Sequence, residues 1–189
     1  MPTVEFDLSP KQYRALDSLR EPSVQELMYG GAKGGGKSVF GCRWVMLQAM
    51  DVIKTCKIEK SDTPPVIGFM GRKQSVDFTS TTLETWKRFI PSSAYELKAS
   101  EKIIIINGRV AVRYGGLDDS DTIRKFNSAE FAFYFIDQAE ECAENDVGML
   151  RGTLRLKVNG IQPADKGLLT ANPAQCWLKK AFITAPQEG

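Results

Sequence analysis

The chain has 189 residues, with 25 Lys and Arg against 23 Asp and Glu, four cysteines and no histidine. This length fits one domain over residues 1–189, the net charge of +2 gives no bulk attraction to nucleic acid, and the lack of histidine excludes histidine bases and histidine-ligated metals. The sequence shows no C-x-x-C pair, signal peptide or bilayer-length apolar run, so we expect an intracellular protein without disulfides, zinc or a membrane span.

The first predicted element is a helix that begins at Pro10. Ser9 is a favourable N-cap residue, and proline suits the first helical turn. Apolar residues recur at helical spacing up to Leu19. The segment 21–23, Glu-Pro-Ser, then ends the helix.

A phosphate-binding pattern follows. Gly31-x-x-x-x-Gly36-Lys37-Ser38 comes after an apolar strand and before a helix over residues 39–50, which is the context that a P-loop requires. Backbone N–H groups of such a loop converge on phosphate oxygens at a helix N-terminus. We expect Lys37 to reach the β- and γ-phosphates of ATP and Ser38 to ligate Mg²⁺; the alternative is a glycine-rich turn without function. The predicted nucleotide-binding residues are Gly31, Ala32, Lys33, Gly34, Gly35, Gly36, Lys37, Ser38 and Val39.

Three elements are predicted in the middle of the chain. Residues 66–70 are a buried strand, with Arg72 just after its end. Residues 77–90 have the apolar spacing of an amphipathic helix. Residues 103–106 and 110–112 flank Asn-Gly, which predicts a β-hairpin.

The apolar run 131–136 predicts a buried strand that ends at Asp137, and residues 167–170 predict a last core strand. An acid in the position of Asp137 is the usual second Mg²⁺ group of a P-loop site, and this role is favoured over the alternative of a helix N-cap. Strands therefore alternate with helices. This order predicts an α/β fold with a mostly parallel central sheet, flanked by helices and carrying a β-hairpin insertion.

Hydrolysis also needs a group that orients or deprotonates water. Gln138 directly follows Asp137 and is a poor base, although its amide could orient water. Glu140 lies about one helical turn after Asp137 and is the leading candidate base, with Glu141 next. Alternatively, both glutamates are first-turn acids that the helix dipole favours.

Several blocks in this order resemble the large terminase subunit of tailed bacteriophages, the DNA-packaging motor. The resemblance covers roughly residues 7–183. It rests on the segments 8–12, 29–38, 68–72, 135–141 and 169–173, with Trp177 and Phe182 beyond. It implies a P-loop NTPase of the RecA-like (ASCE) type that binds ATP and Mg²⁺.

The resemblance also implies roles for individual residues. Gln12 would read the adenine edge, and Lys33 stands where the family commonly has an arginine that senses the nucleotide. Arg72 is a candidate active-site or intersubunit arginine. Thr170 and Asn172 would sense the γ-phosphate.

The function that the resemblance implies is ATP hydrolysis that drives double-stranded viral DNA into a procapsid. The implied partners are DNA bound without sequence reading, further copies in a ring, the portal protein and the small terminase subunit, in the cytoplasm of the infected bacterium. Candidate DNA contacts are Lys125, Arg151, Arg155 and Lys157. No acidic cluster follows residue 165, so we expect the family's C-terminal nuclease domain to be absent from this chain.

Two other functions remain open. A RecA- or helicase-like ATPase that acts on nucleic acid would share the P-loop and Asp137, but a helicase needs a second lobe. A regulatory module that binds nucleotide with weak hydrolysis is compatible with Gln138 in place of a glutamate.

Overall fold

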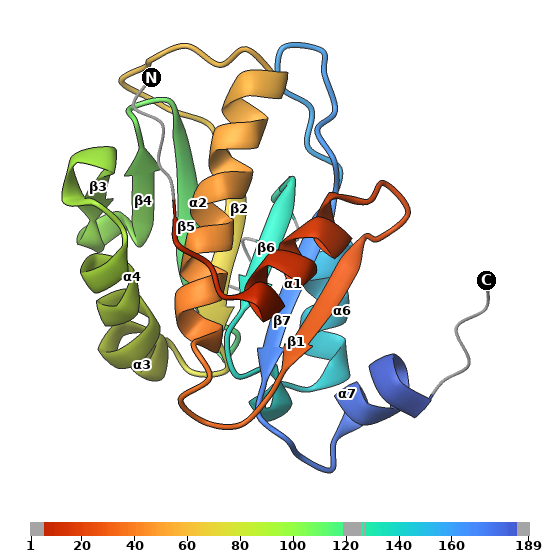
Figure 1. Cartoon of the computed structure of the whole chain (residues 1–189). Coiled ribbons are helices and arrows are strands. Elements are labelled where there is room, and N and C mark those ends of the chain that lie inside the picture. Colours follow the sequence, from red (N-terminus) through yellow and green to blue (C-terminus); the bar gives the residue numbers. More distant parts are fainter. Residues whose placement is uncertain (1–5, 119–125, 127, 185–189) are drawn as a thin grey trace.

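The computed structural model describes residues 6–118, 126 and 128–184. Its strands form one seven-stranded sheet in the order β1-β7-β6-β2-β5-β4-β3, with helices on both faces (Figure 1). The strands are β1 Glu26–Gly30, β2 Val66–Arg72, β3 Tyr95–Lys98, β4 Ile103–Ile106, β5 Val110–Gly116, β6 Phe133–Ile136 and β7 Lys166–Ala171. Neighbouring strands in the series β1-β7-β6-β2-β5 are parallel, whereas β4 pairs antiparallel with β5, and β3 pairs antiparallel with β4. The mostly parallel sheet predicted from the sequence is confirmed.

Helices and short helical turns connect the strands. The main helices are α1 Pro10–Arg20, α2 Lys37–Thr55, α4 Leu83–Phe89 and α6 Glu144–Arg151. Shorter pieces are α3 Ser75–Asp77, the π-helical turn η1 Phe78–Thr82, the 3₁₀ turns η2 Ser92–Ala94, η3 Ala99–Glu101 and η4 Ala139–Glu141, then α7 Trp177–Lys179 and the π-helical η5 Lys180–Thr184. The side chain of Ser9 caps α1, as the sequence predicted.

The two faces of the sheet have separate hydrophobic cores. All four residues of β6 are buried. Phe133 and Phe135 belong to the core that includes α1 and α2, while Tyr134 and Ile136 belong to the core that includes α6. A strand covered on both faces is apolar at every position, which explains the continuous apolar run in the sequence.

Helix α2 lies unusually close to β6. A methyl group added at Gly41 would lie 2.0 Å from the Cζ atom of Phe135, so only glycine allows this approach. The contact brings the first turn of α2 close to the end of β6. Both elements carry predicted site residues.

Two expectations need correction. The hairpin exists, with positive φ at Asn107 and Gly108, but its second strand β5 also pairs in parallel with β2. It therefore belongs to the main sheet rather than to an insertion. The helix expected over residues 77–90 begins at Ser75 and ends at Phe89, and the π-helical turn η1 interrupts it.

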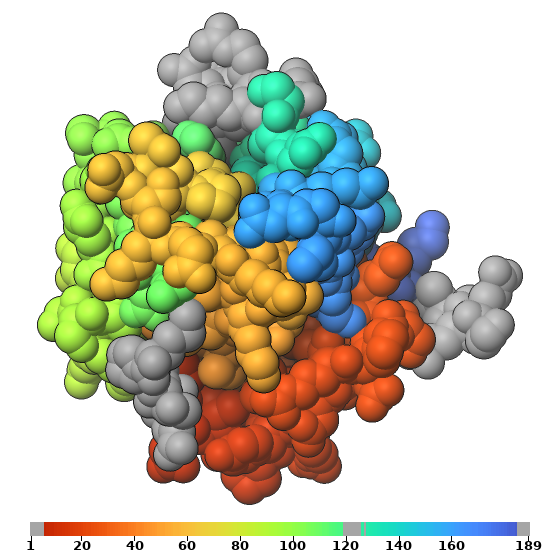
Figure 2. Space-filling view, turned by 90° about the horizontal axis from the view of Figure 1, so that it is seen from above, coloured from red at the N-terminus to blue at the C-terminus, as the bar shows by residue number. Residues whose placement is uncertain are grey.

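Figure 2 shows the end of the molecule that lies opposite the start of α2. There the segment that follows α2 lies against residues 159–161, because Asn159 donates to the Cys56 carbonyl at 2.8 Å and the Cys56 thiol lies 3.8 Å from the Ile161 carbonyl. Among the described residues, no helix has the length and apolar character that crossing a bilayer requires.

Candidate active site

The predicted site residues lie along one edge of the sheet, where the carboxyl ends of the parallel strands meet. β1 ends before the P-loop, β2 ends at Arg72, β6 is followed by Asp137 and β7 by Asn172. Because β7 lies between β1 and β6, Asn172 is placed between the P-loop and Asp137. This edge is the usual ligand position in open α/β sheets.

The P-loop has the backbone that its glycines predict. Gly34 and Gly36 have φ values of 78° and 71°, and Gly36 is the N-cap of α2. Such angles are costly for residues with a Cβ atom. Lys37 is 8% exposed, and its Nζ donates to the carbonyl oxygens of Gly31 at 2.8 Å and Ala32 at 2.7 Å. The ammonium group therefore lies over the loop, at the N-terminus of a long helix.

Helix α1 is attached to this loop by two side chains. Gln12 accepts from the Ser9 N–H at 2.9 Å and donates to the Gly36 carbonyl at 3.2 Å. Lys11 donates to the Gly30 carbonyl at 2.9 Å. Gln12 is 6% exposed, and both ends of its amide have protein partners. Its geometry shows a structural contact with the P-loop, whereas the adenine-reading role stays a prediction.

Asp137 is buried and held on both carboxylate oxygens. Its Oδ1 accepts from the Thr170 hydroxyl at 2.6 Å and its Oδ2 from the Thr82 hydroxyl at 2.7 Å. Its backbone N–H donates to the Gly71 carbonyl at 2.9 Å. Only 3% of Asp137 is exposed, and Thr82 and Thr170 are fully buried. Thr170, expected as a γ-phosphate sensor, thus contacts the carboxylate of Asp137.

The chain turns sharply after Asp137. Gln138 has a left-handed backbone, with φ 55° and ψ 51°, and its side-chain oxygen accepts from Arg72. Arg72 also forms an ion pair with Glu141 at 3.0 Å and donates to the Thr81 hydroxyl at 2.9 Å. Arg72 is only 6% exposed, so its own chain surrounds the guanidinium.

Glu140 has a different partner from the residues on either side of it. Its Oε1 accepts from the Asn172 amide at 2.6 Å. Its Oε2 is buried and has no hydrogen-bond partner among the described residues. A buried acceptor without a partner is rare in folded proteins and needs an explanation.

The donors available for a metal are oxygen atoms. Ser38 and Cys42 are one helical turn apart on α2 and share a face of it, and the Cys42 thiol lies 3.7 Å from the Thr82 carbonyl. Burial, and next the negative charge of Asp137, raise the pKa of the Cys42 thiol well above its usual value. Ser38 therefore faces the side of α2 where Asp137 lies. No group of three or more His, Cys, Asp or Glu residues that could hold a metal occurs in the described parts of the chain. One hydroxyl and one carboxylate suit Mg²⁺ that is bound mainly by substrate phosphates.

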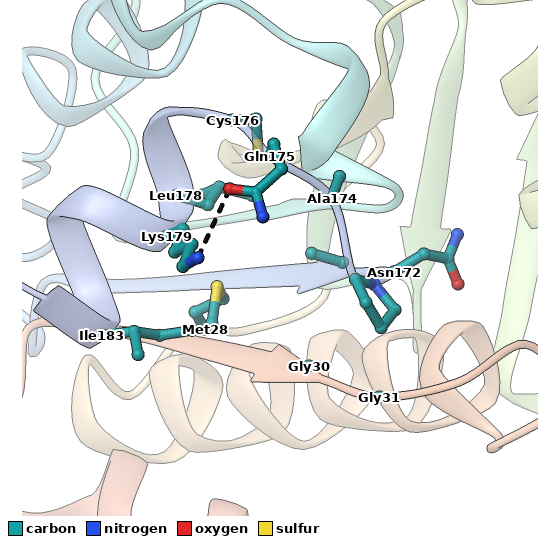
Figure 3. Close-up of a pocket in the computed structure, with 12 residues that line it drawn as sticks. Met28, Gly30, Gly31, Asn172, Ala174, Gln175, Cys176, Leu178, Lys179 and Ile183 are labelled. Carbon is teal, nitrogen blue, oxygen red and sulfur yellow. Dashed lines mark hydrogen bonds between the residues drawn. The ribbon is translucent and has the colours of Figure 1, made fainter.

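A cavity of about 640 Å³ lies next to the P-loop, between the end of β1 and the segment α7–η5 (Figure 3). Met28, Leu178 and Ile183 give it an apolar lining. The Asn172 side chain points away from these residues, toward Glu140. Asn172 lines the cavity and donates to Glu140, so this residue connects the cavity with the polar cluster around Asp137.

The other predicted site residues differ in exposure. Lys33 is exposed and forms no hydrogen bond or ion pair with any described residue, and Val39 is half-buried in the first turn of α2. Thr81 and Thr82 were missed, because nothing in an amphipathic helix pattern separates a site threonine from an ordinary one.

The candidate DNA contacts are partly engaged within the chain. Arg151 pairs with Glu26 at 2.6 Å and Arg155 with Glu130 at 3.4 Å. Lys157 is exposed, and Lys125 lies outside the described residues. The two arginines therefore have structural partners already.

Comparison with known proteins shows similarity in fold. No protein-family model matches the chain, and no curated protein matches it. The large terminase of a thermophilic bacteriophage matches with a TM-score of 0.70 and 17% identity over 95% of this chain and 43% of that one. The same terminase in complex with ATP-γ-S matches with a TM-score of 0.65 and 19% identity, over 94% of this chain and 42% of that one. The large terminase of bacteriophage HK97 matches with a TM-score of 0.59 and 10% identity, over 97% of this chain and 38% of that one.

The chain spans less than half the length of these terminases. At such low identity the similarity establishes the fold. The predicted α/β fold with a mostly parallel sheet is confirmed, and the resemblance to terminase large subunits is confirmed at the level of the fold.

Proposed function

We propose that this chain is an Mg²⁺-dependent ATPase that drives packaging of double-stranded viral DNA. The observation that carries the proposal is that Lys37 of the P-loop, Asp137 and Glu140 lie along the same edge of the sheet. Hydrolysis requires a phosphate cradle, a metal-side acid and a base for water. The described residues supply a candidate for each of the three. Fold similarity to a terminase that binds ATP-γ-S supports the choice of nucleotide.

The P-loop would bind the phosphates of ATP. Lys37 would exchange the carbonyl oxygens of Gly31 and Ala32, which it now contacts, for the β- and γ-phosphates. Ser38 and Asp137 would hold Mg²⁺, which neutralises charge that develops on the phosphates. The two hydroxyls that donate to Asp137 hold its carboxylate in a fixed orientation.

Glu140 would act as the general base. Asn172 holds Oε1, so Oε2 is the atom free to accept a proton from the attacking water. Glu141 and Gln138 both contact Arg72 instead, which leaves Glu140 as the better candidate. Asn172 would register loss of the γ-phosphate, and its contact with Glu140 directly after β7 supports this role.

Assembly and partners follow from the similarity to phage large terminases. We propose a homo-oligomeric ring that acts on double-stranded DNA with a portal protein and a small terminase subunit, in the cytoplasm of the infected bacterium. The arginine that completes each site from a neighbour would not be Arg72, because its guanidinium is buried and paired in its own chain. The exposed Lys33 is better placed to reach a nucleotide or a neighbouring subunit.

The test is steady-state hydrolysis of Mg-ATP by the 189-residue chain, alone, with double-stranded DNA and with single-stranded DNA. Lys37→Ala serves as the blank, since its loss removes the phosphate contact. We expect turnover that the blank lacks and that DNA stimulates. ATP binding without turnover would favour the nucleotide-binding module. Stimulation by single-stranded DNA alone would favour a helicase-like enzyme, and absence of ATP binding would refute the proposal.

A further inference from the structure

One threonine of the helical segment 75–89 behaves differently from the others. The segment contains four threonines. Thr79, Thr81 and Thr85 each donate their hydroxyl to the carbonyl four residues back, at 3.0, 2.6 and 3.0 Å. This is the ordinary bond of a helical threonine. Thr82 instead donates across the molecule to Oδ2 of Asp137 at 2.7 Å.

Thr82 is the last residue of the π-helical turn η1. The carbonyl four residues before Thr82 belongs to Phe78, and in the π turn that carbonyl accepts from the Leu83 N–H, five residues later. The Thr82 hydroxyl donates away from its own helix, to Asp137. π-helical turns occur frequently at functional sites.

The position of Thr82 is fixed from a second side. The Cys42 thiol of α2 lies 3.7 Å from the Thr82 carbonyl oxygen. Cys42 lies one helical turn after Ser38. Thr82 therefore lies between the helix that carries Ser38 and the carboxylate of Asp137. The Thr82 side chain is fully buried. If its hydroxyl were removed, water could not replace this donor without a rearrangement.

We propose that Thr82 is a positioning residue for the metal-side carboxylate. It holds Oδ2 of Asp137 so that the remaining lone pairs face Ser38 and the phosphates. This inference rests on the proposed function, because it assigns a supporting contact within the same site. Hydrogen-bond partners of a carboxylate that binds metal commonly contribute roughly 10–100-fold to metal affinity.

The test compares Thr82→Val, which keeps the shape and removes the hydroxyl, with Thr82→Ser, which keeps the hydroxyl. Binding of a fluorescent ATP analogue is titrated with Mg²⁺ and in EDTA, so the readout does not depend on turnover. For Thr82→Val we expect the Mg²⁺ concentration at half-maximal binding to rise roughly 10–100-fold, with binding in EDTA unchanged. Thr82→Ser should stay close to the wild type. Thr79→Val removes an exposed hydroxyl of the same helix and is the matched control.

A double variant separates positioning from general damage. In an Asp137→Asn background, Thr82→Val should cause no further change in Mg²⁺ dependence, because its effect passes through that carboxylate. An unchanged Mg²⁺ titration for Thr82→Val would overturn the inference while the proposed function stands. Failure of the wild type to bind Mg-nucleotide would overturn the proposed function itself. If Thr82→Val does not fold, Thr82→Cys replaces it, and this weaker donor must still raise the Mg²⁺ requirement.

Discussion

At the scale of single residues, the left-handed backbone of Gln138 decides which side chains enter the site. It reverses the chain directly after Asp137, so that Gln138 and Glu141 contact Arg72 while Glu140 contacts Asn172. A non-glycine residue in this conformation costs on the order of 1 kcal/mol, and such strain concentrates at functional sites. The proposed base, Glu140, therefore lies three residues after Asp137 and not directly after it.

Glu140→Gln should abolish hydrolysis and leave nucleotide binding intact. The amide keeps the size of the side chain and an acceptor for Asn172, but it cannot take a proton. Loss of a general base lowers turnover by roughly 10²–10⁴-fold. Single-turnover hydrolysis and ATP-analogue binding, measured on the same preparation, check this. Retention of normal turnover would remove Glu140 from the mechanism.

The control is Gln138→Glu, which places a carboxylate directly after Asp137. Because the side chain at this position contacts Arg72, the new glutamate should pair with the guanidinium and should not rescue hydrolysis in the Glu140→Gln background. A rescued double variant would show that the residue after Asp137 can reach the water, contrary to this structure.

The sequence predicted only part of this cluster. Lys37, Asp137 and Glu140 could be found because a glycine-rich loop, a buried strand and an acid after it leave strong local patterns. Thr82 could not, since a π turn has no recognisable sequence pattern and its partner is 55 residues away. The pairing of Arg72 with Glu141 was equally hidden, because it depends on the backbone of Gln138.

At the scale of elements, the contact between α2 and β6 determines how far the P-loop lies from Asp137. The sequence predicted both elements, but it did not predict their distance, which depends on the absence of a side chain at Gly41. The strand β3 and the parallel pairing of β5 with β2 were missed for a similar reason. A local Asn-Gly turn indicates a hairpin, whereas nothing local specifies which distant strand β5 joins.

Gly41→Ala should destabilise the protein by about 1–3 kcal/mol, the usual cost of overpacking. The added methyl group would overlap the ring of Phe135, and the chain neighbours of Gly41, Phe40 and Cys42, are fully buried. The displaced α2 should also weaken Mg-nucleotide binding. Gly148→Ala in α6 is the matched control, because no atom lies within 4 Å of the added group. The control should gain roughly 0.5–1 kcal/mol from helix propensity. Urea unfolding checks both changes, and equal stabilisation by the two would contradict the close approach.

At the scale of the whole molecule, the order of the strands assembles the site. β7 lies between the P-loop strand β1 and the strand β6, and this places Thr170 against Asp137 and Asn172 against Glu140. The sequence indicated alternating strands and helices, but strand order is a property of long-range pairing. The order became clear only in the folded structure.

This arrangement predicts that Mg-nucleotide stabilises the whole fold. The ligand would contact the loop after β1 and Ser38 of α2, and through Mg²⁺ it would contact Asp137 after β6. It would therefore connect elements on both sides of β7. At a concentration roughly 100 times its Kd, such a ligand adds about 2.7 kcal/mol. For a chain of this size that raises the melting temperature by roughly 5–11 °C. Thermal unfolding with a non-hydrolysable ATP analogue measures the shift. Lys37→Ala should lose the shift altogether, whereas Asp137→Asn should lose only the part that depends on Mg²⁺. An equal shift in all three proteins would mean that the nucleotide binds away from this edge of the sheet.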